Sequence, residues 1–118
     1  MELNSKGVNA NIKAVILSDK EMRKIGFTDH QKNKWYFCRV LKCSKDITFN
    51  VTISKDGSDD LAIDILDEQF LQPYDYQCAL QINQKHPFAL KVKDEIEGFM
   101  NYLNGCGVLS GHEYGAYI

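Results

Sequence analysis

Long apolar runs, phosphate-binding loops and secretion signals are missing from this sequence, and each absence excludes a class of function. No stretch approaches the ~18 apolar residues of a membrane span, so we expect no membrane partner. The opening residues, MELNSKGVNANIK, lack the apolar segment of a signal peptide, which predicts a cytoplasmic protein. Neither a P-loop nor a GxGxxG fingerprint occurs, so the sequence does not indicate nucleotide binding.

Cysteine and proline are scarce, with four and two residues among 118. Cys38 and Cys43 are separated by four residues, and Cys78 and Cys106 lie far from them, so none shows the paired spacing of a zinc site. We therefore expect reduced structural thiols and no cofactor. The three histidines lie far apart in the sequence, each in a predicted loop, and no serine or cysteine has an obvious base partner. The sequence thus predicts no catalytic residues.

Charge is distributed unevenly. Residues 1–59 hold eleven lysine and arginine residues against seven acids, whereas residues 60–118 hold three against nine. Such a bipolar chain folds so that its halves attract each other, associates head to tail, or simply has an uneven solvated surface. With 44% hydrophobic residues, the chain is long enough for one core, and we predict a single domain over 1–118.

The sequence predicts little regular structure at the start of the chain, followed by a short helix. Residues 1–12 are polar and are expected to be loose or to form a weak edge strand. Residues 13–17 are a short apolar run that can pair as a strand. Ser18 and Glu21 have the spacing of a capping box, and Gly26 fits the end of the helix that they would begin.

A period of two then predicts an antiparallel meander. Three β-rich runs, 35–41, 47–54 and 61–67, are separated by turn-like segments. In the middle run, the apolar residues from Ile47 to Ile53 alternate with polar ones, which indicates one buried face and one solvated face.

Helical periods return after the meander. Pro73 is predicted to be the first residue of a helix with Tyr74, Cys78 and Ile82 on one face, and Pro87 to open a longer helix that ends at 104–105. The longer helix carries a stripe for the core: Phe88, Val92, Ile96, Phe99 and Leu103. The predicted fold class is α+β, a meander of three or four antiparallel strands with a short N-terminal helix and C-terminal amphipathic helices on one face.

The glycine-rich tail, residues 108–118, carries too many apolar side chains for a solvated segment. It is expected to add a strand at a sheet edge or to dock on a second subunit, and we predict a homodimer through it.

The corner between the meander and the helices is the candidate binding surface. It groups two tyrosines, a carboxylate and two glutamines around Pro73: Gln72, Tyr74, Asp75, Tyr76 and Gln77. Tyrosines with convergent polar groups can orient a ligand or anchor a protein partner, or can instead tie the loop to the core. Four further aromatic and histidine residues complete the candidates: Trp35, His112, Tyr114 and Tyr117.

Two other readings compete with binding at this corner. Asp64, Asp67 and Glu68 could hold a divalent cation for hydrolase or nuclease chemistry, although a solvated strand end explains the same acids. The basic N-terminal half, with Trp35, Tyr36 and Phe37 interleaved, permits nucleic-acid binding. The net charge of −2 makes that partner the weaker choice. The leading hypothesis is a non-enzymatic protein that occupies a protein partner or sequesters a small ligand.

Overall fold

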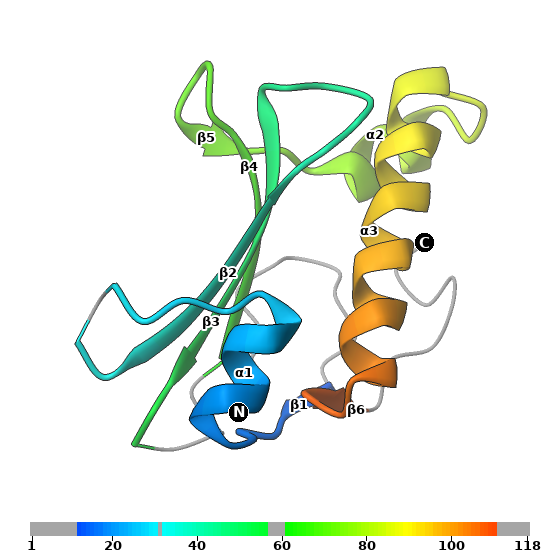
Figure 1. Cartoon of the computed structure of the whole chain (residues 1–118). Helices are drawn as coiled ribbons and strands as arrows, with labels where there is room; N and C mark the ends of the chain where they lie inside the picture. Colours follow the sequence, from blue (N-terminus) through cyan, green and yellow to red (C-terminus); the bar gives the residue numbers. More distant parts are fainter. Residues whose placement is uncertain (1–11, 31, 57–60, 111–118) are drawn as a thin grey trace.

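The computed structural model describes residues 12–30, 32–56 and 61–110 and has two antiparallel sheets (Figure 1). The larger sheet has the order β2-β3-β4-β5. Its strands are β2 (Lys34–Val40), β3 (Ile47–Ser54), β4 (Leu61–Asp67) and β5 (Gln72–Pro73). The smaller sheet pairs β1 (Lys13–Ala14) with β6 (Leu109–Ser110). The predicted meander is therefore confirmed, with a short fourth strand at its end.

Three helices accompany the sheets: α1 (Asp19–Ile25), α2 (Tyr76–Ile82) and α3 (Pro87–Gly105). Figure 1 shows α1 and α3 on the same side of the large sheet, with α3 as the long C-terminal helix. The predicted α+β fold is confirmed. Ser18 caps α1 by accepting a hydrogen bond of 3.2 Å from the N–H of Glu21, and Gly26 ends the helix with a φ of 126°.

The core lies between the large sheet and the helices. Phe37, Val51 and Ile63 are opposite each other on β2, β3 and β4, and each is at most 1% exposed. The alternation predicted for β3 is confirmed, because Ile47, Phe49, Val51 and Ile53 are all buried. These residues share one face, since successive side chains of a strand point to opposite sides.

The opposite face of β3 is less wet than the alternation predicted. Thr48 and Asn50 are only 6% and 4% exposed. Asn50 accepts a hydrogen bond from the hydroxyl of Tyr36 on β2 and donates one of 2.9 Å to Oγ1 of Thr48. Thr48 also donates a hydrogen bond of 2.8 Å to Glu68, and such partners make the burial of these polar groups tolerable.

The helix predicted from Pro73 begins three residues later. Pro73 belongs to β5 and pairs with Leu66, and the next residue donates a hydrogen bond of 2.9 Å to the carbonyl of Ile65. An edge strand accepts proline because the missing N–H removes no bond of the sheet. Asp75 then starts α2 by accepting a bond of 2.9 Å from the N–H of Cys78.

The late start also changes the buried face of α2. The sequence placed Tyr74, Cys78 and Ile82 together, but Cys78 is exposed and Ile82 is 83% exposed. Tyr76 and Leu80, each 1% exposed, face the core instead. The buried row is thus shifted by two residues from the predicted one, and its members are again four residues apart on one face of the helix.

The long helix begins at Pro87 as predicted and ends at Gly105. Val92, Ile96 and Leu103 of the predicted stripe are buried, whereas Phe88 and Phe99 are half-buried and pack against the core. Met100 is also fully buried and was missed. The true stripe is thus wider than a single row, as expected for a helix that covers a sheet.

Both ends of the described chain meet in the small sheet. Of the predicted strand 13–17, only Lys13 and Ala14 are extended in β1, and Ile12, predicted to be loose, is fully buried. Val108 and Leu109 are buried against the same chain. Residues 1–11 and 111–118 lie outside the described residues. The predicted homodimer through the tail stays a prediction. In the described ranges, no helix is long and apolar enough to cross a membrane.

Candidate functional site

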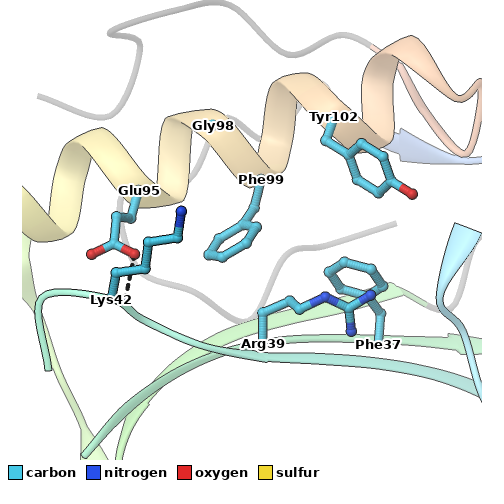
Figure 2. A pocket seen from close by; sticks show the side chains of 7 residues that line it. All are labelled: Phe37, Arg39, Lys42, Glu95, Gly98, Phe99 and Tyr102. Atoms are coloured by element: carbon cyan, nitrogen blue, oxygen red, sulfur yellow. Dashed lines mark hydrogen bonds between the residues drawn. The ribbon is translucent and has the colours of Figure 1, made fainter. Parts of the chain in front are cut away.

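A pocket of about 380 Å³ lies between β2 and α3. Figure 2 shows side chains from the strand and the following loop on one side and from the helix on the other. The lining is a mixture of aromatic and charged residues: Phe37, Arg39, Lys42, Glu95, Gly98, Phe99 and Tyr102. A cavity of this size suits a small molecule or one or two side chains of a partner.

Arg39 is one of the two cations that line the pocket. Its guanidinium carbon lies 4.2 Å from the centroid of the Phe37 ring, and its Nη1 donates a hydrogen bond of 2.8 Å to the carbonyl of Cys38. Gly26 adjoins the same guanidinium so closely that a Cβ there would overlap Nη2. Among the described residues, no carboxylate lies within ion-pair distance of Arg39. The cation is therefore held in place without being neutralised.

The aromatic walls come from the helix and the sheet. Phe99 stacks on Phe49 with a centroid distance of 5.2 Å, and the ring of Tyr102 lies 6.4 Å from that of Phe37. The Tyr102 hydroxyl donates a hydrogen bond of 2.7 Å to the carbonyl of Ile25, which joins α3 to the end of α1. These rings present apolar surface beside the guanidinium in Figure 2.

Spacing along α3 brings its lining residues to one side. Glu95, Phe99 and Tyr102 follow each other at intervals of four and three residues, so they project over successive turns of one face. Gly98 lies between them, and a Cβ at this position would have no neighbouring atom within 4 Å. The missing side chain at Gly98 keeps the helix side of the pocket open.

Glu95 closes the other end. Its two carboxylate oxygens accept hydrogen bonds of 2.6 and 2.8 Å from the backbone N–H groups of Lys42 and Cys43. Burial by itself would raise the pKa of Glu95, but these donors and the Cys43 thiol outweigh it and hold the pKa below its usual value. Burial and the nearby Glu95 raise the pKa of the Cys43 thiol to about 11. Glu95 is thus an ionised structural group.

The electrostatic balance of the pocket favours an anion. Arg39 and Lys42 contribute two positive charges, while the charge of Glu95 is engaged by the loop backbone. A carboxylate or phosphate could form charge-assisted bonds to the guanidinium, and its apolar body could lie on the aromatic rings.

The residues of the predicted binding corner make contacts within the fold. Tyr76 and Gln77 are buried, and Asp75 caps α2. Tyr74 packs edge to face on Phe88 with ring centroids 5.6 Å apart, and Gln72 is exposed in β5. None of the five lines the pocket. Binding at this corner stays a prediction.

Of the four other predicted residues, Trp35 lies within the described ranges. Trp35 is 1% exposed, with Arg23 and Lys55 over its ring at 5.4 and 4.4 Å. Its buried ring offers little surface for stacking on a base. His112, Tyr114 and Tyr117 lie outside the described residues.

The three candidate metal ligands do not form one site. Asp67 accepts hydrogen bonds from the backbone of the turn after β4, at 3.0 Å from Gln69 and 3.3 Å from Phe70. Glu68 accepts a bond of 2.8 Å from Thr48, and Asp64 lies on the face opposite to Asp67 because strand residues alternate. In the part of the chain that the structure describes, no group of three His, Cys, Asp or Glu side chains could hold a metal ion.

Sequence reasoning named Arg39 and Lys42 only as part of a basic half and Phe99 only as core, and it missed Glu95 and Tyr102. One signal was available in β2, where Trp35, Phe37 and Arg39 share the period of the buried face. A charged residue at an inward position of a strand indicates a functional cavity or a paired charge. No comparable signal marks Glu95, whose partners are backbone groups 52 and 53 positions away.

Comparison with known proteins supports the fold alone. No protein-family model matches the sequence, and no curated protein matches it. The chain is similar to the crystal structure of a DUF1831 family protein from Lactobacillus plantarum, with a TM-score of 0.63 and 12% sequence identity. The superposition covers 93% of this chain and 92% of that one.

Proposed function

We propose that this chain is a cytoplasmic binding protein that sequesters a small anion with an apolar body in the pocket between β2 and α3. One observation carries the proposal: the guanidinium of Arg39 lies beside three aromatic rings and has no carboxylate partner among the described residues. A cation held in this way is prepared for an anionic group.

Further features support a preformed binding site and a cytoplasmic location. Phe37 below the guanidinium and Gly26 beside it restrict its orientation before any ligand arrives. Such restriction lowers the entropy that is lost when the ligand binds. All four cysteines are free thiols, as is usual for proteins of a reducing compartment.

The proposal is tested by calorimetric titration with 3-phenylpropionate, whose carboxylate and ring match the two parts of the pocket. The matched probe is 3-phenylpropylamine, which has a similar body and the opposite charge. We expect the acid to bind at least about tenfold more tightly than the amine, because Arg39 and Lys42 attract the first and repel the second.

Two variants locate the binding. Arg39→Gln should weaken the acid about tenfold, since the guanidinium supplies its charge-assisted bonds. Arg23→Gln removes the other arginine, which pairs with Asp29 outside the pocket, and should leave the affinity unchanged. Equal affinity for acid and amine, or equal effects of both variants, would contradict the proposal.

A further inference from the structure

The outer edge of β2, beside the pocket, has backbone hydrogen-bonding groups that no described residue occupies. The strand lies at the end of the large sheet, and Tyr36 exchanges two hydrogen bonds of 2.8 Å with Thr28 on its outer side. Alternate residues of an antiparallel strand direct their N–H and C=O groups to the same side. Cys38 and Val40 therefore also direct theirs outward, whereas Leu41 donates a bond of 3.0 Å inward to Ile47.

This open edge is short. Three of its groups are free of partners within the described ranges: the N–H of Cys38 and the N–H and C=O of Val40. Thr28 occupies the edge before this point. Val40 itself is 54% exposed. An uncovered edge is a template for one more strand.

Arg39 links this edge to the pocket. Its Nη1 binds the carbonyl of Cys38, and that carbonyl points outward with the other groups of the open edge. The same guanidinium lines the pocket with Phe99 and Tyr102. A strand added at the edge would therefore end against a cation and beside an aromatic cavity.

We propose that the ligand of the pocket is the C-terminal end of an extended peptide, which adds to β2 along Cys38–Val40. The peptide runs antiparallel to β2, as all strands of this sheet do with their neighbours. Its terminal carboxylate meets Arg39, and its last side chain, apolar or aromatic, enters the pocket between Phe99 and Tyr102. This inference rests on the proposed function and specifies its ligand as a peptide terminus.

The geometry favours a peptide over a second copy of this chain. Edge pairing of two β2 strands around a two-fold axis at Cys38–Val40 would bring two Arg39 side chains together, and like charges at such a junction repel. The open segment spans only three residues before Thr28 closes the edge, which suits the end of a peptide better than a long intersubunit ladder.

The test is calorimetry with an acetylated tetrapeptide of threonine, valine, threonine and phenylalanine that carries a free C-terminal carboxylate. We expect it to bind about tenfold more tightly than 3-phenylpropionate, because it adds backbone hydrogen bonds to the same carboxylate and ring. The C-terminal amide of this peptide should bind about tenfold more weakly than the acid, since it lacks the charge that faces Arg39.

A variant at the edge of β2 distinguishes binding of the tetrapeptide from binding of 3-phenylpropionate. Val40→Pro removes an outward N–H and no bond to β3, so an edge strand can accept it. The tetrapeptide should lose about tenfold in affinity for Val40→Pro, whereas 3-phenylpropionate should bind this variant as it binds the wild type. Val40→Thr keeps the N–H and should bind both probes normally. In the wild-type protein, the peptide should also slow hydrogen exchange at the amides of Cys38 and Val40.

The outcomes distinguish the two proposals. If 3-phenylpropionate binds through Arg39 and the tetrapeptide binds no more tightly, the peptide inference is wrong and the small-anion function stands. The inference is also wrong if exchange at Cys38 and Val40 is unchanged by saturating peptide. If neither probe binds, the small-anion function fails, and the peptide inference that rests on it fails as well.

Discussion

The backbone N–H of Cys43 donates a hydrogen bond of 2.8 Å to the carboxylate of Glu95, which lies 52 positions later in the chain. The N–H of Lys42 donates a second bond, of 2.6 Å, to the other oxygen of this carboxylate. One side chain of α3 thus holds the loop that follows β2, and it closes one end of the pocket.

The first prediction concerns the stability that Glu95 provides. Glu95→Gln removes the charge that accepts both backbone bonds, and we expect the free energy of unfolding to fall by about 1–3 kcal/mol. Urea titration at neutral pH measures it. Asp94→Asn, at an exposed neighbouring position on the same helix, is the matched control and should change the stability by less than about 0.5 kcal/mol.

The stabilisation by Glu95 should depend on pH. Because the folded state lowers the pKa of Glu95, the stabilisation is complete above the unfolded value of about 4.3 and is lost as the pH falls through the lower folded value. The difference in unfolding free energy between the wild type and Glu95→Gln should be constant above about pH 5 and should shrink below about pH 4. A difference that stays constant to the lowest measurable pH would show that the charge of Glu95 plays no part.

A second prediction compares two glycines. Gly26→Ala places a Cβ against Arg39 at a φ of 126° and should cost about 1–3 kcal/mol of stability. Gly98 has open space around a built Cβ and lies inside α3, so Gly98→Ala should stabilise the protein by about 0.5–1 kcal/mol. Thermal unfolding of both variants measures the contrast. Equal melting temperatures would contradict the packing of Arg39 on Gly26.

A third prediction separates the two stacked phenylalanines. Phe49 is fully buried, so Phe49→Ala should cost about 3–5 kcal/mol. Phe99 is half-buried at the pocket wall, and Phe99→Ala should cost only about 1–2 kcal/mol, because part of its ring already faces water. Chemical denaturation of the two variants measures which one loses more stability. A larger loss for Phe99→Ala would contradict the assignment of Phe49 to the core.

The fourth prediction concerns the start of α2. Asp75→Ala removes the side chain that accepts from the N–H of Cys78 and should destabilise the protein by about 1 kcal/mol. Asp75→Asn keeps a capping oxygen and should cost little. If both changes have the same effect on the melting temperature, the cap does not start this helix.

Local pattern was sufficient for most of the fold. The alternation in β3, the capping serine of α1 and the proline at the start of α3 each act over a few neighbouring residues, so the sequence predicts them directly. The start of α2 could not be predicted in this way. Pro73 pairs with Leu66 of β4, and this strand pairing outweighs the local preference of proline for a first helical turn.

The sequence by itself determined the three long strands, the long helix and their α+β class, because hydrophobic periods report which face of an element is buried. Only the tertiary structure decided the site. Arg39 on β2 meets Phe99 and Tyr102 on α3 across about 60 residues of chain, and no local pattern encodes that meeting. The residues of the predicted corner, adjacent in sequence, have separate structural contacts because consecutive side chains of a helix or strand point in different directions.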